Sequence, residues 1–136
     1  MPVIKETELK QRIAQGQFSN VYFFYGPDHF FIVKYAKAII KKVVAKQFKS
    51  FNLQWFHGDK LVMDELQEAI ESLPMMAKYK CVVVQNLNMD ALSKADYAQL
   101  KDILKFLNET TILIFFADKI VYDVKRSSRF KTITNQ

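Results

Sequence analysis

The chain has 136 residues, of which 50% are hydrophobic and 25% charged, so one domain with a real core is expected and a disordered or collagen-like chain is excluded. Its single cysteine, Cys81, excludes an internal disulfide, and the lack of a signal peptide or a long apolar run predicts a cytoplasmic chain outside the membrane. The net charge of +6 is compatible with a nucleic-acid partner without demonstrating one.

The first half of the chain predicts a helix, a buried strand, a long helix and an edge strand, in that order. A short helix is expected over residues 7–15, and Gly16 is placed to end it. The run Val21–Tyr25 is apolar throughout, which is typical of a parallel strand covered on both faces. A helix is expected over residues 28–48, with its apolar stripe opposite a face of lysines. Alternation at Asn52–Trp55 indicates a half-exposed edge strand.

A helix, a proline and another buried strand follow. Asp59 is expected to cap the helix, whose buried stripe begins at Met63 and ends at Leu73. Pro74 should end this helix, because the residue before a proline is pushed out of the α region. Cys81–Val84 is apolar throughout and therefore predicts a third strand buried on both faces.

The last part of the chain repeats the alternation of helix and strand. Ser93 and Asp96 resemble a capping box at the start of a helix that runs to about Leu107. Thr111–Phe116 predicts a fourth strand, and a further helix is expected over residues 123–130. Strands that alternate with helices at this spacing predict a three-layer α/β domain with a parallel sheet and right-handed crossovers.

The first strand-to-helix turn lacks the residues that a nucleotide-binding loop needs. It contains Gly26, Pro27 and Asp28, but no second glycine, lysine or hydroxyl at the required spacing. The third strand ends in Gln85 and Asn86, where a metal-binding or phosphate-accepting site would place an acidic residue. We therefore interpret the turn as a degenerate nucleotide loop and expect no catalysis, no cofactor and no metal site.

An unusually apolar connection joins the second long helix to the third strand. Such connections are normally polar, but this one carries Leu73, Met75 and Met76 around Pro74. Two interpretations stay open, since the methionines either cap the core or form an exposed contact surface. Both adjacent methionine side chains cannot easily point inward, which favours a contact surface.

The order and spacing of these motifs resemble the N-terminal domain of the delta subunit of the bacterial DNA polymerase III clamp loader. The likeness begins with the helix before Gly16, includes the strand and turn at residues 21–28 and continues through residues 51–59. It is most specific at residues 71–80, where a Ser-Leu-Pro sequence is followed by two large apolar residues, a small residue, a basic stretch and a valine strand. Residues 115–119 match the end of the fourth strand.

The resemblance implies an AAA+-like domain over residues 1–136, with a decayed ATP site and with the family's lid domain, collar domain and fifth strand absent. Because the fifth strand of such sheets lies beside the first, Val21–Tyr25 is expected to be left as an unpaired edge. The chain would be a non-catalytic component of the DNA polymerase III holoenzyme in DNA replication. Its partners would be the sliding clamp (the beta subunit), the other loader subunits and primed DNA.

The resemblance also implies a role for the apolar connection. In this family it enters a pocket of the sliding clamp and opens the ring, so Leu73, Met75 and Met76 would be the clamp-binding residues. Pro74 would hold them rigidly, and the supporting residues Lys78 and Lys80 would steer them toward an acidic clamp surface.

Two other functions remain as alternatives. One is an enzyme, a nucleotide-binding α/β domain with an atypical phosphate site. The other is a basic domain that binds DNA directly through the lysine face of the first long helix, which carries Lys34, Lys37 and Lys41.

Overall fold

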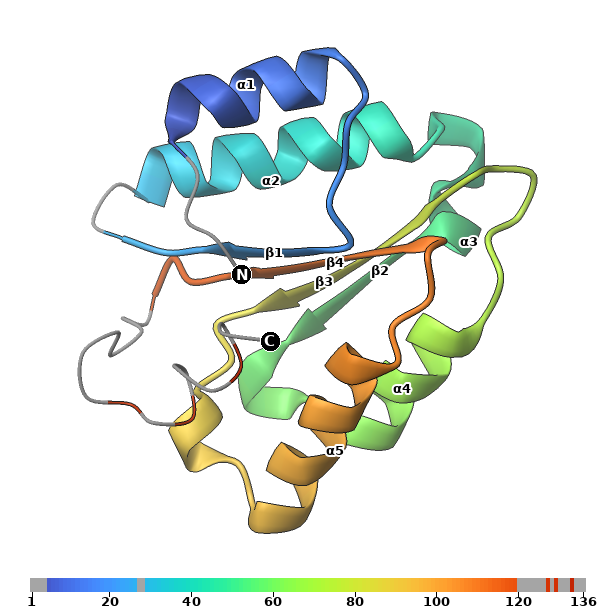
Figure 1. Cartoon of the computed structure of the whole chain (residues 1–136). Helices are drawn as coiled ribbons and strands as arrows, with labels where there is room; N and C mark the ends of the chain where they lie inside the picture. The colour runs from blue at the N-terminus through green and yellow to red at the C-terminus, as the bar shows by residue number, and fades with distance from the viewer. Residues whose placement is uncertain (1–4, 27–28, 120–126, 128, 130–132, 134–136) are drawn as a thin grey trace.

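A sheet of four parallel strands lies between two layers of helices (Figure 1). The computed structural model describes residues 5–26, 29–119, 127, 129 and 133. In this part of the chain the sheet has the order β1-β4-β3-β2. Its strands are β1 (Val21–Phe24), β2 (Leu53–His57), β3 (Lys80–Gln85) and β4 (Thr111–Phe116). The predicted α/β class with a parallel sheet is confirmed.

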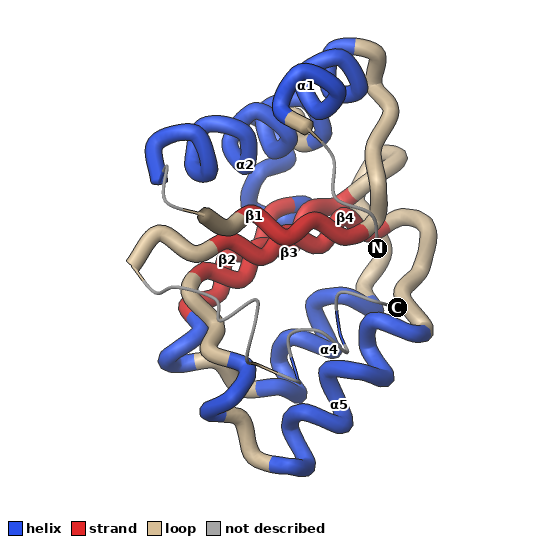
Figure 2. The backbone as a smooth tube through the Cα atoms, turned by 60° about the vertical axis from the view of Figure 1, so that its left-hand side comes forward, coloured by secondary structure: helices blue, strands red, loops and turns tan. Residues whose placement is uncertain are grey.

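Each face of the sheet is covered by a pair of helices (Figure 2). The short helix α3 (Lys49–Asn52) leads directly into the edge strand β2. Among the described residues, every helix is too short or too polar to span a membrane. One face carries α1 (Glu6–Ala14) and α2 (His29–Val43), and the other carries α4 (Met63–Glu71) and α5 (Lys94–Lys105).

The two central strands, β3 and β4, supply side chains to both cores. Val82 and Leu113 pack in the core beneath α4 and α5, whereas Val83 and Ile114 pack in the core beneath α1 and α2. Successive residues of a strand point to opposite faces, so an uninterrupted apolar run serves both cores at once. This is why β3 and β4 can be recognised from the sequence.

Local signals at two helix ends are confirmed. The Ser93 hydroxyl accepts a hydrogen bond from the backbone N–H of Asp96 at 3.1 Å and caps the start of α5. Gly16, with φ of +71°, follows α1 in the left-handed region that glycine adopts without steric cost. The Tyr35 hydroxyl of α2 donates to the Glu6 carboxylate of α1 at 2.5 Å and so joins these two helices.

Several predicted boundaries are wrong. The long helix ends at Val43, because the backbone becomes extended at Ala45 (φ −67°, ψ 138°), and a 3₁₀ turn over Lys46–Phe48 follows. Asp59 lies in a 3₁₀ turn and does not cap α4, whose N-cap position is Val62. Asn52 does not start the edge strand but ends α3, where it is buried.

The two edges of the described sheet are β1 and β2. The predicted edge strand is β2, which begins one residue later than expected and pairs with β3 alone in the described part of the chain. Within the same residues, β1 pairs with β4. Most of the helix predicted over residues 123–130 lies outside the described residues.

Candidate interaction site

Residues 72–79 connect α4 to β3 at the amino edge of the sheet, opposite the turn that follows β1 (Figure 1). We call this connection the tip. Leu73 and Met76 expose 81% and 83% of their surface, and Met75 exposes 43%. The helix ends at Glu71, so the prediction that Leu73 belongs to the buried stripe of α4 is wrong. Capping of the core is therefore excluded for Leu73 and Met76.

Asn52, at the end of α3, anchors the tip. Its side chain is buried, with 1% of the residue exposed. The side-chain amide donates to the backbone carbonyl of Met75 at 2.8 Å, and its oxygen accepts from the backbone N–H of Met75 at 2.7 Å. This reciprocal pair reproduces the hydrogen bonds that a neighbouring strand would make with Met75.

Lys80 holds the base of the tip from inside the protein. Only 3% of the residue is exposed, and its ammonium donates to the backbone carbonyls of Ala69 and Ser72 at the end of α4. These carbonyls have no partner within the helix, so Lys80 acts as a C-terminal cap. Burial lowers the pKa of Lys80 to about 8, although the nearby Glu71 carboxylate opposes this shift. The expectation that Lys80 steers a partner is wrong, because its charge does not reach the surface.

Asn108, which precedes β4, completes the base. Its side-chain amide donates to the backbone carbonyl of Ile70 at 3.0 Å, and the Thr111 hydroxyl donates to the same oxygen at 3.2 Å. The last turn of α4 is therefore fixed by side chains from two other segments. The tip projects from a rigid support.

The backbone of the tip adopts an uncommon conformation at Met76, where φ is +50°. A side chain in this left-handed region meets the carbonyl oxygen that follows it, at a cost of roughly 1–2 kcal/mol. Residues held in such conformations concentrate at functional sites. The conformation keeps the Met76 side chain exposed next to the anchored Met75.

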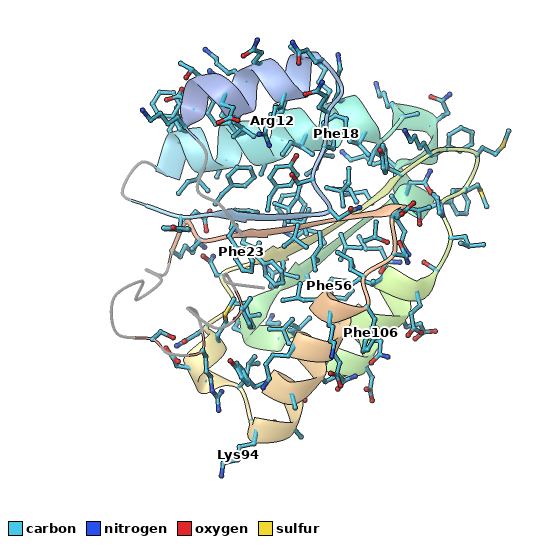
Figure 3. All side chains as sticks on the ribbon, viewed as in Figure 1. Arg12, Phe18, Phe23, Phe56, Lys94 and Phe106 are labelled. Carbon is cyan, nitrogen blue, oxygen red and sulfur yellow. The ribbon has the colours of Figure 1, made fainter. Side chains whose placement is uncertain are left out.

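The other residues predicted to support the tip lie at its surface. Pro74 is partly buried, and Lys78 is exposed with its Nζ 5.1 Å from the centroid of the Tyr79 ring. The Tyr79 and Phe18 rings form a T-shaped pair at a centroid distance of 6.1 Å. Lys78 is therefore the one cation of the predicted pair that can meet a partner. Figure 3 draws the side chains on the ribbon and labels Phe18.

The carboxyl edge of the sheet carries a closed polar network. The Trp55 indole N–H donates to the Gln85 side chain at 2.9 Å, and the Gln85 amide donates to both Asp118 carboxylate oxygens at 3.1 Å. The Asn86 amide donates to Asp118 at 2.7 Å, while its oxygen accepts the backbone N–H groups of Asp118 and Lys119. This network occupies the edge where an α/β nucleotide site would lie.

The side-chain amides of Gln85 and Asn86 both donate to the Asp118 carboxylate of this network. Burial alone would raise the pKa of Asp118, but hydrogen bonds from Asn86 and Gln85 outweigh it and hold the pKa below its ordinary value. Within the described residues, no three His, Cys, Asp or Glu side chains lie close enough to hold a metal ion. Gly26 has φ of +128° at the end of β1, whereas Pro27 and Asp28 lie outside the described residues.

Sequence reasoning finds the apolar residues of the tip but misses the residues that hold it. The alternation of the sequence places Asn52 in an edge strand, where a polar residue is ordinary. The role of Asn52 depends on contact with a segment 23 residues away, and no local sequence pattern indicates such a contact. The network of Gln85, Asn86 and Asp118 escapes prediction for the same reason.

A family model described as DNA polymerase III, delta subunit, matches residues 22–136. The chain belongs to this delta-subunit family. Comparison of the delta-family chain with curated protein sequences finds no match. Its tip lies within the matched residues.

Two solved structures share the fold of this delta-family chain. The DNA clamp loader delta protein of Bacillus subtilis has a TM-score of 0.77 at 19% identity, over 94% of this chain and 39% of that protein. A DNA polymerase III gamma subunit-related protein of Thermotoga maritima has a TM-score of 0.55 at 10% identity, over 91% and 48% of the two chains. The delta-family chain therefore spans less than half the length of either protein.

Proposed function

We propose that this chain binds a DNA sliding clamp through the tip and helps to open the clamp ring for loading onto primed DNA. It acts as a non-catalytic part of a clamp loader in the bacterial cytoplasm, together with the other loader subunits. The observation that carries the proposal is the exposed apolar tip on a rigid support in a chain of the delta-subunit family.

Three properties of the tip support a partner surface. Leu73 and Met76 leave large apolar side chains in water, which is costly unless a partner covers them. Methionine side chains are flexible and polarisable, so they adapt to the shape of an apolar pocket. The hydrogen bonds to Met75 fix the backbone before a partner arrives, which reduces the ordering cost of binding.

The binding experiment compares the wild-type chain with the triple variant Leu73→Ala, Met75→Ala, Met76→Ala. Burial of one such side chain at a partner surface contributes roughly 1.5–3 kcal/mol, and a loss of 1.4 kcal/mol weakens binding about tenfold. We expect the triple variant to bind the cognate clamp at least about 100-fold more weakly in surface plasmon resonance, although single losses will not add simply. Circular dichroism should show an intact fold.

A matched control tests whether exposed apolar area alone explains the result. Phe30 and Val62 expose 74% and 51% of their surface and lie beyond the carboxyl edge of the sheet, away from the tip. The variant Phe30→Ala with Val62→Ala should bind the clamp as the wild type does. Wild-type binding by a folded triple variant would refute the assignment of the tip. Turnover of Mg-ATP by the wild-type chain would favour the enzyme alternative instead.

A further inference from the structure

The side chain of Asn52 joins the tip to the segment before the edge strand. The amide of this buried residue satisfies both the N–H and the carbonyl of Met75 at 2.7 and 2.8 Å. We propose that Asn52 is the positioning residue of the tip, which holds Leu73 and Met76 in the arrangement that the clamp meets. The inference rests on the proposed function, because it assigns a role at the same site.

The location of the Asn52 contact within the tip supports this role. Pro74 has a fixed φ on one side of Met75, and Met76 has a left-handed φ on the other. Met75 itself is free of both restraints and lies between them, so its conformation depends on the hydrogen bonds from Asn52. Without them the two ends of the apolar surface, Leu73 and Met76, would reorient relative to one another.

The direction of the contact separates positioning from general support. Both side-chain hydrogen bonds of Asn52 go to Met75 inside the tip, whereas Lys80 bonds to carbonyls where α4 ends and the tip begins. Loss of the Asn52 amide should therefore loosen the tip and leave α4 in place. Loss of the Asn20 amide, which donates to backbone carbonyls just before and at the start of β4, should leave both the tip and α4 unchanged.

The experiment compares Asn52→Ala with Asn20→Ala in the whole chain. Each substitution removes one amide that bonds to a backbone group at the amino edge of the sheet, so the two are matched in chemistry and location. Clamp affinity is measured by surface plasmon resonance, and stability by urea unfolding. Amide hydrogen exchange of residues 73–78 is measured in the free chain, where a change confined to the tip marks positioning.

We expect Asn52→Ala to weaken clamp binding tenfold or more and to speed exchange at residues 73–78. Asn20→Ala should bind within threefold of the wild type, with unchanged exchange at the tip. The inference is overturned if Asn52→Ala binds as the wild type, or if both variants weaken binding equally in proportion to lost stability. If the wild-type chain does not bind the clamp, the proposed function itself fails, and the inference falls with it.

Discussion

At the scale of single residues, burial of the Lys80 ammonium makes the stability of this chain depend on pH. The pKa of Lys80 is about 8 in the folded chain, against 10.5 in the unfolded chain, mainly because burial penalises the charged form. The unfolded state therefore binds more protons than the folded state between these two pH values. The buried Lys80 ammonium therefore lowers the free energy of unfolding by its full amount below pH 8. This loss of stability disappears as the pH rises toward 10.5.

A comparison of the wild type with Lys80→Met tests this dependence. Relative to the variant, the free energy of unfolding of the wild type should rise between pH 8 and 10 with a slope of up to about 1.4 kcal/mol per pH unit. Below pH 8 the difference between the two proteins should be constant. Urea unfolding at pH 7, 8, 9 and 10 gives both quantities. Parallel curves over the whole range would show that Lys80 stays protonated in the folded chain.

At the scale of elements, the turn after β2 packs directly on the turn after β3. A Cβ atom at Gly58 would lie 2.4 Å from both the Asn86 carbonyl oxygen and the Leu87 Cα. These are backbone atoms, which cannot rotate away as a side chain would. Position 58 therefore requires glycine, because the two turns approach each other too closely for any side chain. This close contact fixes the distance between the turn after the edge strand and the turn after β3.

The substitution Gly58→Ala should destabilise the chain by roughly 1–3 kcal/mol or more, because the turn must move away from Asn86. Gly16→Ala serves as the control, since a Cβ there meets no atom within 4 Å and only the positive φ is strained. The left-handed conformation at Gly16 should cost an alanine there roughly 1–2 kcal/mol. Urea unfolding measures both variants. A loss at Gly58 no larger than the loss at Gly16 would contradict the prediction, because it would show that the turn accommodates a Cβ beside Asn86.

The same scale shows which parts of the fold are predictable. The strands β3 and β4 are apolar at successive positions, so a short run of neighbouring residues is enough to predict that each strand is buried on both faces. The cap at Ser93 spans three residues and is equally local. By contrast, Asn52 and Lys80 are polar residues that become buried only through partners distant in sequence. Polar residue types predict exposure. The contacts that bury these two side chains form only in the folded chain.

At the scale of the whole molecule, the net charge comes from one stretch. Residues 29–58 contain six lysines and no acidic residue, which equals the net charge of +6 of the entire chain. The exposed lysines of this stretch lie on α2, in the 3₁₀ turn that follows it and at the start of α3, so the excess positive charge is concentrated on these elements. The remainder of the chain is balanced in charge.

This distribution predicts weak, salt-dependent association with duplex DNA through α2. We expect a weaker salt dependence in the triple variant Lys37→Gln, Lys41→Gln, Lys42→Gln. The negative slope of log affinity against log salt should become shallower by about 0.9 for each phosphate that the lysines no longer neutralise. Fluorescence anisotropy at several salt concentrations measures the slope. The control removes the same charge from α5, which also carries acidic residues, by Lys94→Gln, Lys101→Gln and Lys105→Gln. Equal effects of both variants would mean that total charge, and not its location, governs the association.

The central location of β3 gives the tip a mechanical property. Lys80 follows the tip immediately and opens a strand that pairs with β2 on one side and β4 on the other. Tension applied to the tip along β3 therefore acts parallel to both ladders, whose hydrogen bonds must shear together and cannot unzip one at a time. A force between the tip and a bound partner is thus distributed over the whole sheet, and β3 is extended little by it.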